Sequence, residues 1–483
     1  MVLDQLAARL RRVNRYNLQT LRRSPAAEIS GALGDLGTLL PVMIALAVQG
    51  SINLSSTLVL SGIFNMATGA AFGVPLPVQP MKAIAAASIA RKSSLSETVA
   101  AGSWVGAVVL VLSITGLLRA LTRCVPVPVV KGIQLGAGLR LIISAGSSLI
   151  LPLGWWTTPT VLDNRLWALG AFLALLGLGG TTDSQKRSGG KIFPYALVTF
   201  LIGLCFALVT MDNKNVGGLW RWSITTPSFL STEAMGMALA QLPLTTLNSV
   251  IAASALAIDL FPPPSLPPPS LSTDDACPIT PSTTALGISV AAMNLVGCWF
   301  GAMPVCHGSG GLAAQHRFGA RSGASIVLLG GAKVFLGFLS GTLPLIDLLA
   351  TFPRSLLGVM VAAAGLELAR VGASLNHGAQ DLWEEVVTTT SEENDSSDGN
   401  TAGAGTKLRR QHRVISDVER DERWTVMLTT AAGILAFRND SVGFVAGLLC
   451  FAAYRFAEYM DGRRQWRWQS QTEESPLLES RGC

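Results

Sequence analysis

Residues 64–82 read FNMATGAAFGVPLPVQPMK, and this stretch is the starting point for predicting the fold. It begins as an apolar helix, is broken by three prolines, and restarts near Met81. A related break, GCWFGAMPVCHGSGG, lies at residues 297–311. Two interrupted apolar segments in corresponding places indicate a transporter whose binding site lies near the middle of the membrane.

The composition indicates a membrane protein. Of 483 residues, 49% are hydrophobic and only 14% are charged, whereas soluble domains carry about a quarter charged residues. The net charge of +6 comes from basic residues between apolar runs, so no nucleic-acid partner is expected. The seven cysteines are scattered without a CxxC pair, and there are only four histidines, so neither a metal site nor a cofactor is expected.

Apolar runs fall into two sets of seven. The first set lies at about 28–49, 54–73, 81–90, 97–118, 126–150, 164–180 and 192–210. The second lies at about 233–260, 284–303, 309–320, 322–343, 346–370, 424–437 and 440–460. A membrane span needs about 20 residues, so the third run of each set predicts a half-helix. An odd number of segments in each set means that the two sets cross the membrane in opposite orientations. The expected fold is therefore an all-α polytopic membrane protein with about 14 transmembrane segments in a 7+7 inverted repeat.

The expected domain organisation follows these runs. It comprises a basic N-terminal flank (1–27), a first membrane repeat (28–210), a loop (211–232), a second membrane repeat (233–460) and a tail (461–483). Within the second repeat, a Pro-rich linker is expected at 262–283 and a disordered loop at 371–423. Basic residues in the flank, in that loop and in the tail predict that both termini and the loop are cytoplasmic.

The two breaks align with each other. GAAFG at 69–73 matches GCWFG at 297–301, and after one residue of slip PVQ at 77–79 matches PVC at 304–306. Upstream, Asp35 and Asn248 occupy comparable places in the first and eighth runs. This match supports the inverted repeat.

The broken segments predict an anion site. Extended backbone at 75–79 and at 302–307 is tolerated inside a membrane only where its polar groups pair or line a cavity. Each half-helix would aim an amino end, with about half a positive charge and free N–H groups, at the same point. Lys82 adds a full positive charge, and Ser309, Gly310 and Gly311 are expected to leave the other helix end open to a ligand. A small, multiply charged oxyanion fits this arrangement.

Several other polar residues lie in apolar surroundings. Asp35, in GALGDLGTLL, is interpreted as a coupling or gating site, with pairing to Lys82 or helix capping as the alternative. His307 is interpreted as a polar lining residue rather than a metal ligand. Lys333 and Arg140 are expected to snorkel or to pair structurally, and not to bind the substrate.

The chain contains three long motifs: EISGALGDLGTLLP (28–41), PVQPMKAIAAASIA (77–90) and FGAMPVCHGSGGLAAQHRFGARSG (300–323). They resemble motifs of the molybdate transporter family of plants, algae and fungi, a branch of the sulfate permease superfamily. The short tail has no room for the STAS domain of sulfate permeases proper, in keeping with the molybdate branch. The resemblance implies a core domain that holds both half-helices and moves against a gate domain. It also implies a substrate site made of Gln79, Pro80, Met81, Lys82, Cys306, His307, Gly308, Ser309, Gly310, Gly311 and Asn248, with Asp35 facing it.

The expected function is high-affinity molybdate transport by a secondary active carrier that works by alternating access. A sulfate transporter of the same fold is the main alternative, since both dianions are tetrahedral, and an anion channel is another. An intramembrane enzyme with Cys306 as nucleophile and His307 as base is disfavoured, because adjacent residues seldom meet in the required geometry. A nucleobase permease would need acidic residues where Asn248 and His307 stand.

The expected partners are molybdate or sulfate, the lipid bilayer and a second copy of the chain as a homodimer. The expected location is the plasma membrane or a vacuolar or other endomembrane.

Overall fold

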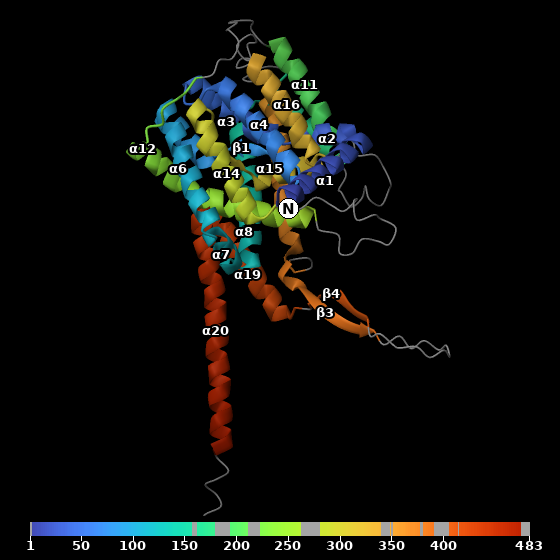
Figure 1. Cartoon of the computed structure of the whole chain (residues 1–483), viewed down its shortest axis with the longest axis vertical. Helices are drawn as coiled ribbons and strands as arrows, with labels where there is room; N and C mark the ends of the chain where they lie inside the picture. The colour runs from blue at the N-terminus through green and yellow to red at the C-terminus, as the bar shows by residue number, and fades with distance from the viewer. Residues whose placement is uncertain are drawn as a thin grey trace, which may run out of the picture.

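The computed structural model describes residues 2–156, 162–178, 194–210, 223–261, 281–339, 348, 351–376, 380–390, 405–413 and 415–474. The predicted linker at 262–283 lies outside these residues except for its last three positions, and the loop at 211–232 is described only from residue 223. Helices make up most of the described structure (Figure 1).

The helices of the first half begin and end near the predicted apolar runs. They are α1 (Val2–Arg23), α2 (Pro25–Ala32), α3 (Leu36–Gln49), α4 (Leu54–Phe72), α5 (Lys82–Arg91), α6 (Leu95–Ile114), α7 (Leu117–Cys124), α8 (Val127–Ser144) with the π-helix η1 (Ala145–Ile150), α9 (Arg165–Leu178) and α11 (Tyr195–Thr210). The strand β1 (Val78–Pro80) lies between α4 and α5.

The helices of the second half also lie near the predicted apolar runs. This half contains α12 (Thr232–Leu244), the π-helix η2 (Thr245–Ala252), α13 (Ala253–Leu260), α14 (Thr283–Gly297) with the short 3₁₀ helix η4 (Cys298–Phe300), the strand β2 (Val305–His307), α15 (Ser309–Arg317), α16 (Ala324–Leu339), α18 (Arg354–Arg370), α19 (Asp417–Phe437) and α20 (Asp440–Glu474). Each of the fourteen predicted runs therefore contains a helix.

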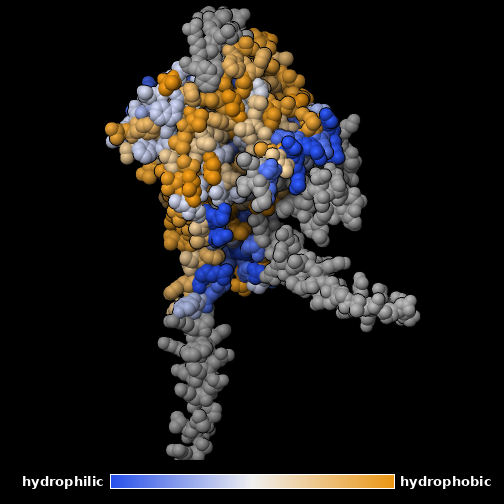
Figure 2. Space-filling model, viewed as in Figure 1, coloured by the Kyte–Doolittle hydropathy of each residue, from blue (hydrophilic) through white to orange (hydrophobic). Residues whose placement is uncertain are grey.

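The chain is an all-α polytopic membrane protein. Among the described residues, seven helices are long and apolar enough to cross a membrane. They are Leu54–Phe72, Leu95–Ile114, Val127–Ile150, Thr232–Leu260, Thr283–Phe300, Arg354–Leu375 and Asp440–Met460. Figure 2 shows hydrophobic residues over most of this face of the helical body, and hydrophilic residues over α1 and near α7 and α19.

Local sequence explains where the central helices begin and end. Asn53 caps α4 by accepting a hydrogen bond from the Ser56 N–H (3.0 Å). Gly73 ends α4 with φ 71°, and Gly301 ends the corresponding helical stretch with φ 70°. Glycine adopts this left-handed conformation without steric cost, so the aligned glycines fix both helix ends.

Helices α4 and α16 pack through glycines. A Cβ atom on Gly62 would lie 2.6 Å from the Gly330 carbonyl oxygen, and one on Gly69 would lie 2.5 Å from the Gly323 oxygen. Small residues allow two membrane helices to approach at backbone distance. This contact fixes α16 against the helix that leads into β1.

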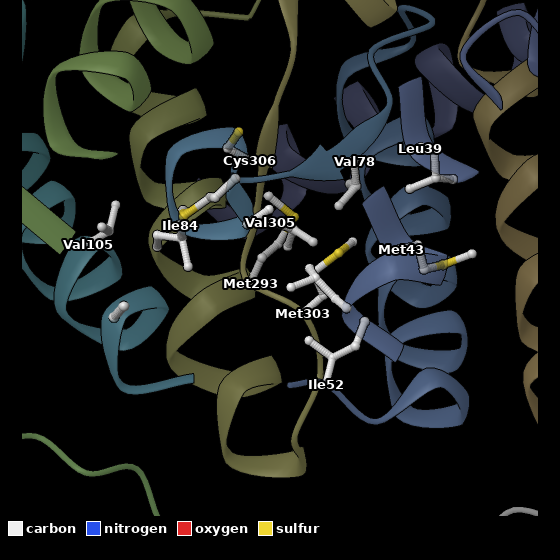
Figure 3. Close-up of a cluster of buried hydrophobic side chains, with 14 of the residues drawn as sticks. Leu39, Met43, Ile52, Val78, Ile84, Val105, Met293, Met303, Val305 and Cys306 are labelled. Atoms are coloured by element: carbon white, nitrogen blue, oxygen red, sulfur yellow. The ribbon is translucent and has the colours of Figure 1, made fainter. Parts of the chain in front are cut away.

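A core of apolar side chains lies beside the strands β1 and β2 (Figure 3). Val78 and Val305 point toward Met293 and Met303, whereas Cys306 points to the other side of the strand. Because side chains alternate across a strand, one face of the pair faces this core and the other faces the starts of α5 and α15.

The expectation of a disordered loop at 371–423 differs from the structure over part of that segment. Strand β3 (Trp383–Thr390) pairs antiparallel with β4 (Gly405–His412). The sequence WEEVVTTT is rich in β-branched residues, which favour the extended conformation.

The last candidate span, Asp440–Met460, ends where the tail was predicted to begin. Helix α20 itself continues to Glu474, and it runs away from the helical body in Figure 1. The predicted tail residues 475–483 lie outside the described residues.

Candidate transport site

The two broken segments meet as a pair of short antiparallel strands. Val78 lies opposite His307, Gln79 opposite Cys306, and Pro80 opposite Val305. The Met81 N–H extends the pairing by donating to the Pro304 carbonyl oxygen (2.9 Å). The extended backbone at each break therefore pairs with its counterpart in the other half, which is one of the two arrangements that the sequence allowed.

Two buried asparagines hold the strands in corresponding ways. The Asn65 side chain in α4 accepts a hydrogen bond from the Val78 N–H (2.7 Å). The Asn294 side chain in α14 accepts from the Val305 N–H (2.9 Å) and donates to the Val305 carbonyl oxygen (2.6 Å). Sequence reasoning missed both residues. The available signal was an asparagine a few residues before each of the aligned GxxFG stretches.

Gln79 lies at the centre of the site and is 2% exposed. Its Nε2 donates a hydrogen bond to Oδ1 of Asp35, which lies in the turn between α2 and α3. The site therefore brings Gln79 and Asp35 into direct contact, although 44 residues separate them in the chain.

The glycines at the start of α15 make room for Gln79. A Cβ atom on Gly308 would collide with Gln79 Oε1, and one on Gly311 would collide with Gln79 Nε2 and with Pro77. A Cβ atom on Gly310 would lie 3.0 Å from Cδ1 of Leu141. Protein side chains therefore lie beside Gly310 and Gly311, and the opening of this helix end to a ligand concerns its N–H groups.

The start of α5 carries Lys82 as its first residue, with the side chain partly exposed. Gln241 of α12 caps this helix, since its Oε1 accepts from the N–H groups of Ala83 (2.8 Å) and Ile84 (3.4 Å). Its Nε2 donates to Thr245 Oγ1 (3.0 Å), which fixes the amide orientation. Gln241 was not predicted; an amide within an apolar helix was its signal.

Charged neighbours surround Lys82. The charged side chains acting on Lys82 include Asp35, Arg140 and Asp440. Arg140 and Asp440 also form an ion pair with each other (2.9 Å), which links α8 to the first residue of α20. Arg140 is therefore structurally paired, as predicted, and it lies near the site.

The start of α15 is arranged differently. Ser309 Oγ donates a hydrogen bond to Oδ1 of Asn248, which lies in the π-helix η2. Within the described part of the chain, no acceptor pairs with the backbone N–H groups of Ser309, Gly310 or Gly311. This helix end keeps three free donors, the feature that binds anions at helix amino termini.

Cys306 and His307 lie on opposite faces of β2. The Cys306 thiol contacts Ser249 and is within electrostatic range of Lys82. The His307 ring is 0% exposed, and its Nε2 lies 3.0 Å from Ser289 Oγ while its edge faces Phe72. This placement differs from the expected lining role of His307 and separates the two groups that an intramembrane enzyme would need together.

Two further predicted site residues, Pro80 and Met81, contribute to the site through their backbone. Pro80 lies in β1, and Met81 is buried and caps α5. Residues whose side chains or N–H groups gather at the two helix starts are Asp35, Gln79, Lys82, Asn248, Cys306, Ser309, Gly310 and Gly311. The described residues hold no group of three or more His, Cys, Asp or Glu side chains that could bind a metal ion.

Comparison with solved structures identifies the fold. The structure of the murine solute carrier 26 family member A9 anion transporter in the inward-facing state matches with a TM-score of 0.51 and 12% identity, over 89% of this chain and 68% of that chain. A second structure of the same carrier, described as its overall structure, matches with a TM-score of 0.50 and 12% identity, over 90% of this chain and 65% of that chain. At this identity, the likeness shows the fold alone.

Sequence comparison identifies the family. A family model described as "Molybdate transporter of MFS superfamily" matches residues 27–141 and 233–368. Molybdate transporter 2 of Arabidopsis thaliana is 36% identical over 391 residues, covering 74% of this chain and 81% of the relative. Molybdate transporter 1 of Chlamydomonas reinhardtii is 29% identical and covers 92% of this chain and 94% of the relative. The chain therefore belongs to the molybdate transporter family, a family of multi-pass membrane transporters and not of enzymes, and its fold is that of the solute carrier 26 anion transporters.

Proposed function

We propose that the chain is a high-affinity, secondary active molybdate transporter that binds the dianion where α5 and α15 begin. The observation that carries this proposal is the convergence of Lys82 and the three free N–H groups of α15 on one strand pair. A cation and a helix amino end together favour a small oxyanion. The molybdate transporters of Arabidopsis thaliana and Chlamydomonas reinhardtii support the identity of that anion.

We propose a division of roles among the site residues. Lys82 supplies charge, and the N–H groups of Ser309–Gly311 supply hydrogen bonds to the oxyanion. Asn248 positions Ser309, and Gln79 links the site to Asp35. Asp35 is the coupling residue, because a carboxylate in an apolar surrounding is costly unless it serves transport.

We propose that the fourteen segments form a 7+7 inverted repeat. Three correspondences support it: Gln79 pairs with Cys306 at the centre of the strand register, Asn65 and Asn294 bind the matching valines, and Gly73 and Gly301 end the matching helices. Antiparallel pairing about equivalent residues is what a two-fold axis in the membrane plane produces.

Alternating access would move one group of helices against another. Two largely buried side-chain pairs lie across such a boundary: the ion pair of Lys131 in α8 with Asp259 in α13 (2.7 Å), and the contact of His316 in α15 with Glu367 in α18 (3.3 Å). We propose that α13 and α15 belong to the core domain and that α8 and α18 belong to the gate domain. These pairs would have to separate during transport.

The orientation and the location are also proposals. The basic composition of residues 1–27 and of β4 supports a cytoplasmic N-terminus and a cytoplasmic β3–β4 segment. A cytoplasmic C-terminus follows from an even number of spans. We place the carrier in the plasma membrane or an endomembrane, as a homodimer.

The test is uptake of labelled molybdate into proteoliposomes, with and without a pH gradient. We expect saturable uptake of molybdate against its concentration gradient. A pH gradient should drive this uptake if molybdate is transported together with protons. Molybdate loaded inside the vesicles should drive it if the carrier exchanges anions. Excess sulfate serves as the competitor. Stronger inhibition by sulfate than by unlabelled molybdate would make sulfate the substrate, and non-saturable flux would favour a channel. The matched control is Lys92→Asn, since Lys92 is an exposed lysine at a left-handed position that asparagine tolerates.

A further inference from the structure

A second lysine is buried in the membrane body. Lys333 of α16 is 5% exposed, and its Nζ atom has no hydrogen-bond partner among the described residues. The contact of α16 with α4 through Gly62 and Gly330 holds this helix at backbone distance. A buried ammonium without a partner is costly in a membrane, so Lys333 requires a nearby negative charge to offset that cost.

That negative charge is Asp35. Asp35 lies in the turn that follows α2, a helix that packs against α16, and it is within electrostatic range of both Lys333 and Lys82. The neighbouring charged groups are occupied elsewhere: Glu28 of α2 accepts from the Arg321 N–H (2.9 Å), and Glu367 pairs with His316. Helix α4, which packs against α16, contains no charged residue. Asp35 therefore interacts with two lysines, Lys82 in α5 and Lys333 in α16.

We propose that Lys333 is a second cation of the transport site and that it acts on the substrate through Asp35. This inference rests on the proposed function. Lys82 and Lys333 contribute two positive charges and an ionised Asp35 removes one, whereas Arg140 and Asp440 cancel each other. When a proton from the aqueous side neutralises the Asp35 carboxylate, the two lysines together balance a molybdate dianion. The loaded site is then uncharged, and one proton accompanies each molybdate.

This arrangement gives Lys333 a positioning role. The lysine does not need to touch the dianion, because Gln79 already connects Asp35 to the start of α15. An uncharged loaded site crosses the low-dielectric membrane interior at lower cost than a charged one. Lys333 thus makes the loaded site neutral only when Asp35 carries its proton.

The experiment is a double-mutant cycle between Lys333→Met and Asp35→Asn, with initial uptake measured against external pH. We expect Lys333→Met to lower uptake at least tenfold and to move the pH midpoint upward by about one unit, because a carboxylate that loses a neighbouring cation takes up its proton more readily. Lys333→Arg should retain the wild-type pH profile. In the Asp35→Asn background, Lys333→Met should produce no further shift in pH dependence.

Three outcomes would overturn the inference: a Lys333→Met variant with wild-type uptake and pH profile, a pH shift that persists in the Asp35→Asn background, or a wild-type proton-to-molybdate ratio other than one. The ratio is measured on the wild-type protein, so the inference stays testable if Lys333→Met does not fold. Wild-type proteoliposomes that do not take up molybdate would contradict the proposed function itself. Normal wild-type uptake with an unaffected Lys333→Met variant would contradict only the role of Lys333.

Discussion

The starts of α5 and α15 are corresponding positions that differ in chemistry. Helix α5 begins with Lys82, and Gln241 occupies the N–H groups of its next two residues. Helix α15 begins with Ser309 and two glycines, and its first three N–H groups have no acceptor among the described residues. One helix end therefore offers a full charge, and the other offers hydrogen-bond donors. Under the proposed inverted repeat, two equivalent helix starts therefore contribute different chemistry to the proposed anion site.

The largest effect is expected at the charged end. Replacing Lys82 by alanine should lower initial molybdate uptake by roughly 100-fold, since loss of a charge-assisted contact to a desolvated anion costs a few kcal/mol. Uptake should be compared at equal amounts of monodisperse protein in the membrane, with Lys92→Asn as the matched control. Wild-type uptake by the Lys82→Ala protein would remove Lys82 from the site.

A smaller effect is expected at the start of α15. Gly311→Ala should displace Gln79 from Asp35, because the added methyl group collides with the Gln79 amide and Pro77. Overpacking of this kind costs about 1–3 kcal/mol, so we expect roughly tenfold weaker molybdate binding and a lower melting temperature. Gly331→Ala is the matched control, since a Cβ there meets no atom within 4 Å. Equal behaviour of the two variants would show that Gln79 does not depend on this glycine.

The next effect concerns pH rather than rate. Asp35→Asn keeps a group that can accept from Gln79 Nε2 but cannot be ionised. Uptake at acidic pH should change little, whereas the fall in uptake toward alkaline pH should be lost. The measurement is initial uptake across the pH range at fixed molybdate. An unaltered pH profile would remove Asp35 from coupling and leave it as a support for Gln79.

The smallest effect is expected far from both helix starts. Deleting residues 391–404, which connect β3 to β4, should leave the apparent affinity for molybdate unchanged within about twofold, because no residue of the site lies there. The half-saturating molybdate concentration measures this. A large change would couple the β3–β4 segment to the transport site.

Much of the site could be predicted because its signals are local. The prolines of residues 64–82 break a helix wherever they occur, and Lys82 follows them directly. Asn65, Asn294 and Gln241 could not be assigned in the same way. An amide in an apolar helix has many conceivable partners, and Gln241 caps a helix 158 residues earlier in the chain.

His307 and Gly311 show how the direction of a side chain depends on strand pairing. His307 was expected to line the site, but the face of β2 on which it lies depends on the register with β1, and a shift of one residue would move it to the other face. The space beside Gly311 could be assigned to Gln79 only after the two segments were brought together. The family resemblance could not supply these side-chain orientations, because it shows which residues match and not where their side chains point.

The pairing of β1 with β2 has a consequence for biosynthesis. Each strand has only three residues, and its partner lies about half the chain away, so neither strand can be satisfied when the first half alone has entered the membrane. The first N–H groups of α5 also have their acceptor, Gln241, in the second half of the chain. The proposed transport site can therefore be completed only after α15 has been synthesised, and a chain truncated before residue 297 would contain Lys82 but no completed strand pair.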